Sequence, residues 1–194
     1  MKIALSLFAI NILFPLMSSA ATLSNLDFES VKGLIPTVGG TPVSEAFPRW
    51  TAFLGDTPQV TCLYNNATTG AAAIALFSTF PPGAGFVISG QYTASLQPGV
   101  FQGGHVSASL AQTGTIAAGS RAMLFSGNAS GMFTVSLAGS LAPIIDLDHS
   151  TPPVLPTTDT YGVDVTGWAG KEVELRFTSL ANSGGLIYWR NDGR

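Results

Sequence analysis

The clearest pattern in the chain is a strict alternation of apolar and polar side chains near its C-terminus. From residue 171 to residue 178, Val173, Leu175 and Phe177 alternate with charged or hydroxyl-bearing side chains. Successive side chains of a β-strand point to opposite faces, so this segment would place its apolar set on one face and its polar set on the other. The pattern predicts an antiparallel strand with one face in the core and one in water.

The rest of the chain reads in the same way. Alternation or a short apolar run predicts strands at residues 26–28, 50–54, 60–64, 72–77, 88–96, 106–110, 122–125, 133–137 and 161–165. Turn residues such as Asn65-Asn66 and Pro98-Gly99 separate them, and the proline-rich segment 141–160 is predicted to be a long loop. No helical period is sustained. We therefore predict an all-β fold, a single β-sandwich or jelly roll.

Composition agrees with strands and turns. Charged residues make up 10% of the chain, against about 25% in an ordinary soluble domain, and there are 22 glycines and 12 prolines. The formal net charge is −3 and there is no basic run, so we expect no nucleic-acid partner. Cys62 is the single cysteine, which excludes an internal disulfide and favours a buried, inert thiol over a bond to another chain.

The first residues have the order of an export signal. Lys2 is followed by an apolar stretch to Met17 and by Ser18-Ser19-Ala20-Ala21, small residues that suit cleavage. The apolar stretch is shorter than the ~20 residues that span a bilayer, and no later segment is longer. We predict a signal peptide at residues 1–21, a β-sandwich domain at residues 22–194, a secreted or cell-surface location, and no transmembrane span in the mature chain.

Several kinds of chemistry have no support in the sequence. The two histidines, His105 and His149, are too few for a three-histidine zinc site. There is no G-x-S-x-G nucleophile motif and no phosphate-binding glycine loop, and the sequence singles out no pair of carboxylates for glycoside hydrolysis. The densest polar cluster, Asp146-Leu147-Asp148-His149, is a weak metal candidate beside a solvated loop. We expect a chain that is not an enzyme.

Two acidic residues are candidates for metal binding. Asp27 and Glu29 are two positions apart and would share one face of the predicted strand at residues 26–28. Paired carboxylate oxygens suit calcium, which makes a structural calcium ion the one cofactor to consider. The competing interpretation is an edge strand that carries protective charges.

Four aromatic residues are candidates for sugar binding, because a ring face can stack against the C–H groups of a pyranose. These are Trp50, Tyr92, Tyr161 and Trp168. Trp168 is the most suggestive of them, since it lies in a turn between Thr166 and Gly170 and not in an alternating strand. The alternative is that a tryptophan at such a corner covers the end of the sandwich core.

Two segments resemble a known family. Asn25-Leu-Asp-Phe-Glu-Ser30 and the segment from Tyr161 to Phe177 together resemble the galactose-binding-like jelly rolls of carbohydrate-binding modules. More narrowly, they are similar to exported bacterial proteins of the PEP-CTERM type. The resemblance implies first and last strands that lie side by side, and a calcium ion held by the opening acidic motif and by acids of the closing strand. After Gly185 the chain has neither those paired acids nor a sorting tail, which fits either a truncated closing strand or a divergent member of the group.

These observations lead to one preferred function and two alternatives. The preferred function is a non-catalytic, exported carbohydrate-binding or cell-surface module, with a polysaccharide or cell-surface glycan as its partner. The first alternative is a structural protein of the envelope or extracellular matrix that binds no small ligand. An unrecognised hydrolase is the less favoured third.

Overall fold

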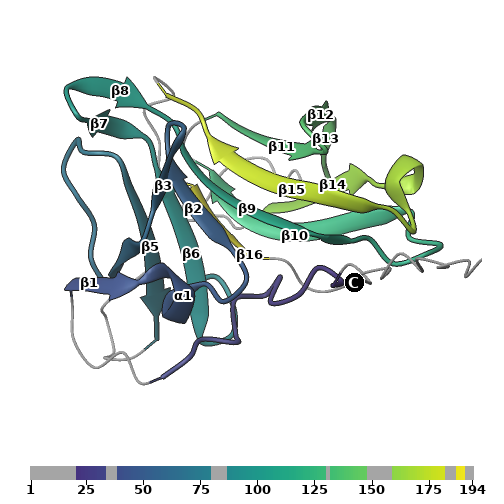
Figure 1. The fold of residues 1–194 in the computed structure, drawn as a ribbon, viewed down its shortest axis with the longest axis horizontal. Helices are drawn as coiled ribbons and strands as arrows, with labels where there is room; N and C mark the ends of the chain where they lie inside the picture. Colours follow the sequence, from purple (N-terminus) through teal and green to yellow (C-terminus); the bar gives the residue numbers. More distant parts are fainter. Residues whose placement is uncertain are drawn as a thin grey trace, which may run out of the picture.

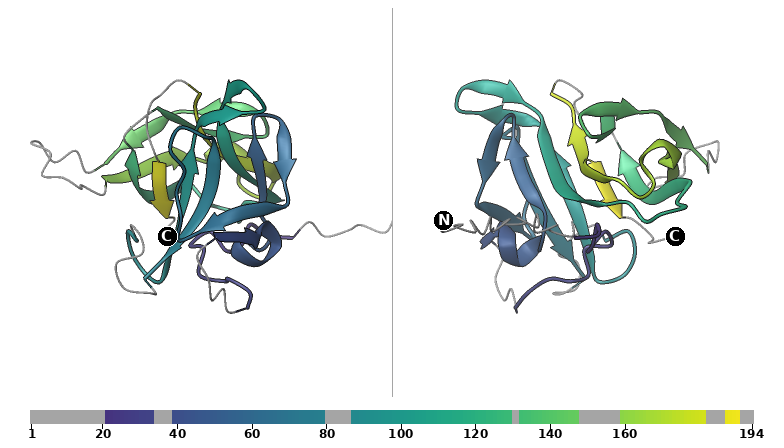
Figure 2. Two further views of the ribbon diagram at one scale, coloured as in Figure 1. Left: turned by 90° about the vertical axis from the view of Figure 1, so that its left-hand side faces the viewer. Right: turned by 45° about the vertical axis from the view of Figure 1, so that its right-hand side comes forward.

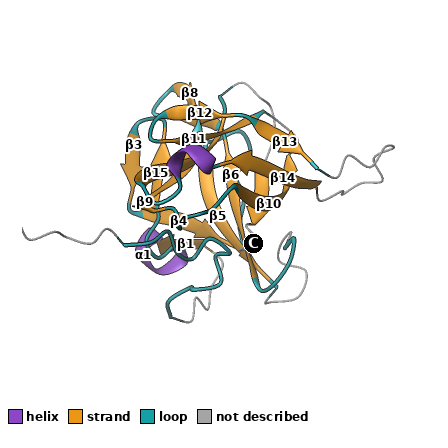
Figure 3. Ribbon diagram, turned by 90° about the vertical axis from the view of Figure 1, so that its right-hand side faces the viewer, coloured by secondary structure: helices purple, strands orange, loops and turns teal. Residues whose placement is uncertain are grey.

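The structure, a computed structural model, describes residues 21–33, 39–79, 87–129, 132–147, 159–181 and 187–190. Across these ranges the chain is almost entirely strand and loop, and helix is confined to α1 (Val43–Ala46) and the 3-10 turn η1 (Thr166–Trp168) (Figure 3). The predicted all-β fold class is therefore confirmed. The predicted signal peptide falls on residues 1–21, of which all but Ala21 lie outside the described residues.

The strands form two large sheets and a hairpin (Figure 1). The eight-stranded sheet has the order β1 (Gly39–Pro42), β4 (Thr61–Tyr64), β5 (Ala73–Ser78), β6 (Tyr92–Gln97), β16 (Ile187–Arg190), β10 (Ala122–Ala129), β14 (Asp159–Asp164), β13 (Ile144–Asp146). The six-stranded sheet has the order β12 (Ser140–Ala142), β11 (Phe133–Leu137), β15 (Glu172–Ser179), β9 (Ala108–Thr115), β2 (Thr51–Leu54), β3 (Thr57–Gln59). The hairpin is β7 (Gly99–Phe101) with β8 (Gly104–Val106). Among the described strands of the two large sheets, β4 and β5 pair in parallel and all other neighbours are antiparallel.

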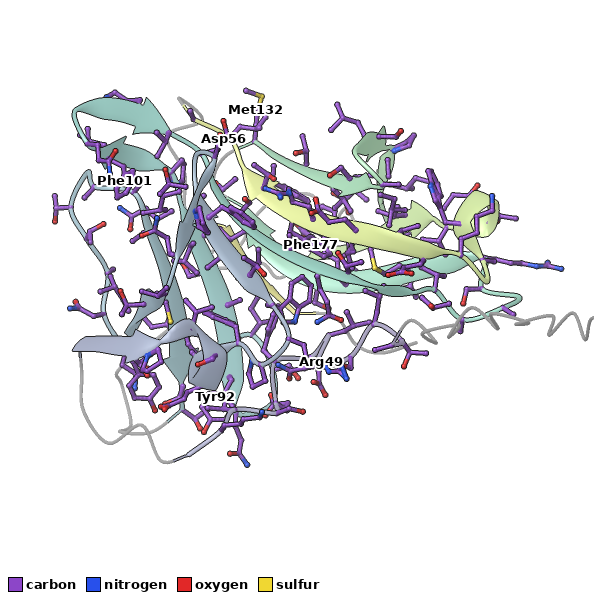
Figure 4. The ribbon with its side chains drawn as sticks, viewed as in Figure 1. Arg49, Asp56, Tyr92, Phe101, Met132 and Phe177 are labelled. Atoms are coloured by element: carbon purple, nitrogen blue, oxygen red, sulfur yellow. The ribbon has the colours of Figure 1, made fainter. Side chains whose placement is uncertain are left out.

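The core lies between the two sheets. Phe125 of β10 meets Phe177 of β15 edge to face with 5.3 Å between ring centroids, so an aromatic contact joins the two layers. Figure 4 shows Phe177 in the middle of the molecule. Val173, Leu175 and Phe177 are all buried while Glu172 is exposed, which confirms the two-residue period predicted for this strand. The chain is thus a β-sandwich.

The order of strands differs from the expectation that the resemblance gave. The last strand, β16, is inserted between β6 and β10, whereas β1 pairs with β4 at the far edge of the same sheet. The first and last strands are therefore not neighbours, and that prediction is wrong. The segment Ile187–Arg190 fills the gap between β6 and β10, and the truncation of the closing strand stays a prediction.

Two local predictions are also corrected. Residues 141–160 are not one long loop, because β12 pairs with β11 and β13 pairs with β14 within that range. Residues 26–28 do not form a strand: Asn25 and Phe28 have left-handed φ angles of 51° and 61°, which turn the chain twice. As a result of this turn, Phe28 is fully buried and its ring packs against Phe47 and Trp50, with 5.8 and 5.5 Å between ring centroids.

This opening segment, drawn in purple in Figure 1, runs beneath the ends of the strands and is held by the buried side chain of Gln112. The amide of Gln112 accepts a hydrogen bond from the Ser24 N–H at 2.7 Å and donates one to the Ser24 carbonyl at 2.9 Å. Figure 2 shows strands β2–β5 in blue on one side of the molecule and strands β10–β14 in shades of green on the other.

Candidate functional site

Two of the four candidate sugar-binding residues lie in the core. Trp50 is 5% exposed and Tyr161 is 9% exposed. A chain of ring contacts leads from Trp50 through Phe177 and Phe125 to Tyr161, with centroid distances of 6.2, 5.3 and 5.4 Å. The Trp50 indole N–H is also used internally, because it donates to the Asn25 carbonyl at 3.0 Å. Core rings already cover these two residues, so their positions do not support the prediction that they stack on a sugar.

The other two candidates are partly buried and come from separate elements. Tyr92 begins β6, at the lower end of the molecule in Figure 4, and burial raises the pKa of its phenol, with further contributions from Tyr64 and Glu29. Trp168 ends η1 and packs against the edge of the core. The packing of Trp168 agrees with the interpretation that it covers the end of the sandwich.

The candidate calcium ligands have other partners. Asp27 Oδ1 accepts the Glu29 N–H at 3.2 Å, and the Glu29 carboxylate accepts the N–H groups of Gln91 and Tyr92 at 3.0 and 3.3 Å. Because the segment turns and is not a strand, the two-residue spacing no longer places the two carboxylates on one face. Glu29 joins the opening segment to the start of β6.

An unexpected cluster lies on the outer face of the six-stranded sheet. Arg176 of β15 projects away from the core, and its Nε donates to Glu174 Oε1 at 2.9 Å while its second amino group lies 3.4 Å from Oε2. The guanidinium carbon lies 4.3 Å from the ring centre of Phe53 on β2, a cation–π contact across the intervening strand β9. We name Phe53, Glu174 and Arg176 the outer-face cluster.

The strand register explains how Arg176 reaches Phe53. Arg176 lies directly opposite Ala111 of β9, whose methyl side chain leaves room for the long arginine stem to cross the strand. Phe53 lies opposite Ser109, and the Ser109 hydroxyl is 3.4 Å from the guanidinium. The two charged side chains keep 26% (Arg176) and 40% (Glu174) of their surface exposed, so their remaining hydrogen-bonding groups face water.

Short hydroxyl side chains surround the outer-face cluster on four strands. They alternate with the core-facing residues of their strands, and all of them are exposed or half-buried: Thr51, Thr113, Thr134, Ser136 and Thr178. The face therefore combines the aromatic ring of Phe53, the guanidinium of Arg176, the carboxylates of Glu172 and Glu174, and a set of hydroxyls that both donate and accept.

Other features of the described residues carry less chemistry. An apolar cavity of about 250 Å³ lies between the opening segment and the ends of β9 and β10, lined by residues that include Leu23, Ile116 and Met123. Within the ranges that the structure describes, no three His, Cys, Asp or Glu side chains gather as metal ligands. In the same ranges, no helix is long and apolar enough to cross a membrane. Asp148 and His149 of the weak metal candidate lie outside the described residues.

Part of the outer-face cluster could be predicted from the sequence. Alternation in residues 171–178 already places Glu174 and Arg176 on the polar face of their strand. Nothing in the sequence connects Arg176 with Phe53, 123 positions earlier, because that contact depends on the order β15-β9-β2 within the sheet.

Comparison with known proteins gives little. No known protein family matches the sequence, and no curated protein matches it. Among solved structures, the chain is similar to the enzymatically active domain of tailspike protein 4 from bacteriophage CBA120, at 17% identity and a TM-score of 0.36. The similarity covers 74% of this chain and 19% of the tailspike chain.

The tailspike comparison corrects one prediction. From the sequence we expect a chain that is not an enzyme, but the similar structure is an enzymatically active domain, so this prediction is withdrawn. At this TM-score the similarity carries no argument for a particular activity.

Proposed function

We propose that this chain is an exported module that binds a carbohydrate on the outer face of its six-stranded sheet. The observation that carries the proposal is the outer-face cluster: a guanidinium held between a carboxylate at 2.9 Å and a phenyl ring at 4.3 Å, on a face that is otherwise rich in hydroxyls. The preferred partner is a polysaccharide or a cell-surface glycan.

The chemistry of a sugar matches these groups. Each sugar hydroxyl donates one hydrogen bond and accepts others, so it pairs best where a donor and an acceptor lie next to each other. The Arg176 N–H groups and the Glu174 carboxylate are such a pair, and the exposed part of Phe53 offers apolar surface for sugar C–H groups. The cluster is built on strands, which hold the groups in place more firmly than a loop would.

Affinity electrophoresis in gels that contain soluble polysaccharides tests the proposal. Wild-type protein should be retarded by at least one polysaccharide, and Phe53→Ala should weaken that retardation about tenfold, which corresponds to about 1.4 kcal/mol. Phe101→Ala is the matched control, because Phe101 is a partly buried aromatic residue of the β7–β8 hairpin, at the upper end of the molecule in Figure 4. No retardation of the wild-type protein across a broad polysaccharide panel would refute the proposal, as would equal losses in the two variants.

Export is supported by the order of Lys2, the apolar stretch and the small residues up to Ala21. Expression in a bacterial host followed by N-terminal sequencing of the exported product should find a start within a residue or two of Ala21 or Thr22. An exported product that still begins at Met1 would contradict the cleaved signal peptide.

A further inference from the structure

We infer that the outer-face cluster selects uncharged glycans and rejects anionic ones such as polyuronates, an inference that rests on the proposed carbohydrate binding. An exposed arginine is by itself the side chain best suited to a carboxylate ligand, because its fork matches both oxygens. In this chain the side of the fork formed by Nε and one amino nitrogen is already occupied. Glu174 takes the Nε–H at 2.9 Å and lies 3.4 Å from the second amino nitrogen.

The charge around the cluster points the same way. Glu172 lies on the same face of β15, two residues before Glu174, so the polar face of this strand carries two carboxylates for one guanidinium. The surrounding described side chains on β2, β9 and β11 are hydroxyls, the methyl group of Ala111 and the phenyl ring of Phe53, and none of them is charged. The whole chain is also acidic, with a formal net charge of −3. A polyuronate would have to displace Glu174 against this negative field.

An uncharged sugar meets no such barrier. The guanidinium has five N–H donors, and the described partners engage it through Nε, one contact from each amino nitrogen, and the ring of Phe53. Donors therefore remain for sugar hydroxyls, while the 40% exposed Glu174 side chain can accept from the same or a neighbouring hydroxyl. The ion pair thus serves as a ready donor–acceptor pair and need not separate when the ligand binds.

Substitution of Glu174 tests the inference directly. Glu174→Gln removes the charge that occupies Arg176 and leaves the side chain nearly the same size. Glu172→Gln is the matched control, because it makes the same change of charge on the same face of the same strand, whereas the ion pair of Arg176 is with Glu174. The probes are polygalacturonate as the anionic polysaccharide and a panel of neutral glucans, xylans and mannans, all at low ionic strength.

Wild-type protein should bind a neutral polysaccharide and bind polygalacturonate at least tenfold more weakly. Glu174→Gln should raise polygalacturonate binding at least tenfold, Glu172→Gln less than threefold, and added salt should abolish the gain because it depends on charge. Wild-type binding to polygalacturonate as tight as to the neutral polymer overturns the selectivity and leaves carbohydrate binding intact. Equal gains in the two variants overturn the role of Glu174, and wild-type binding to none of the polymers overturns the proposed function itself.

Discussion

Phe177 is one of the residues whose rings join the two sheets. It is 2% exposed and contacts Trp50 from one side and Phe125 from the other. Truncation to alanine removes both ring contacts and leaves a cavity that the two rigid sheets cannot close. We expect Phe177→Ala to lower the free energy of unfolding by about 3–5 kcal/mol, measured by denaturant titration.

The control for this substitution is Glu172→Ala on the same strand. Glu172 is exposed at the start of β15, so its truncation should change the free energy of unfolding by no more than about 0.5 kcal/mol. Equal losses for the two variants would show that the strand does not divide into a core face and a water face.

Cys62 predicts a pH dependence of stability. The thiol is 5% exposed, and desolvation raises its pKa from 9.0 to about 12 in the folded chain. Below pH 9 both states hold the proton, whereas between about pH 9 and 12 the unfolded chain releases it first, so the free energy of unfolding falls as the pH rises. The slope from this one group is at most about 1.4 kcal/mol per pH unit.

Comparison with Cys62→Ala isolates that contribution. Burial also raises the pKa of the Tyr161 phenol to about 12, helped by Asp159 and Asp146, and this adds a decline that both proteins share. Denaturant titrations at pH 8 and pH 10.5 should therefore show a larger loss in the wild-type protein than in Cys62→Ala. Parallel losses would mean that the thiol is not buried in the folded state.

At the residue scale, the sequence predicts which face of a strand a side chain occupies better than it predicts which residues that side chain contacts. Alternation places Phe177 inward and Glu172 outward, and the structure agrees. The same alternation cannot say which aromatic residue is covered by others. Tyr161 and Trp50 look like exposed ligand-binding rings until the fold brings Phe125 and Phe177 against them. Such contacts join residues far apart in the sequence, so no local pattern contains them.

At the scale of elements, Gly114 lets the opening segment lie against β9. A Cβ at this position would come within 2.8 Å of the Ala21 carbonyl oxygen and 2.8 Å of the Leu23 backbone nitrogen. Gly114→Ala must push residues 21–24 away from the sheet and loosen the hydrogen bonds between Ser24 and Gln112. We expect a loss of about 1–3 kcal/mol in the free energy of unfolding and faster cleavage of the opening segment in limited proteolysis.

Gly40→Ala serves as the comparison, because a Cβ on Gly40 would meet nothing within 4 Å. That variant should match the wild-type protein in both measurements. A Gly114→Ala protein with unchanged protease resistance would show that the segment does not lie against β9 in solution.

The opening segment also shows why its secondary structure could not be predicted from its own residues. The segment from Asn25 to Ser30 has the residues of a short charged strand. The left-handed conformations of Asn25 and Phe28 turn the backbone instead, and the Phe28 side chain is buried in the core. Asn25 is a residue type that tolerates this conformation, whereas Phe28 does not prefer it. Burial of the Phe28 ring against Phe47 and Trp50 offsets the cost of this backbone conformation. Because these contacts form only in the folded structure, the local sequence does not predict them.

At the scale of the whole molecule, the sequence predicts the class of fold but not the order of its strands. The two-residue period, the turn residues and the low charge are local features, and they suffice for an all-β sandwich. The order β6-β16-β10 requires three segments distant in sequence to pair. No pattern in residues 187–190 predicts that they lie between β6 and β10. The outer-face cluster depends in the same way on the order β15-β9-β2.

The central position of β16 yields the last prediction. β16 pairs with β6 on one side and β10 on the other, so its removal divides the eight-stranded sheet into two parts and leaves two unpaired edges inside the molecule. We expect deletion of residues 187–194 to abolish cooperative thermal unfolding, followed by circular dichroism, and to cause aggregation. Deletion of residues 191–194 leaves both pairings intact and should unfold like the full chain. A synthetic peptide of residues 181–194 added during refolding of the shortened chain should restore the transition by filling the gap as a donated strand. A shortened chain that unfolds at the same temperature as the full one would place the last strand elsewhere.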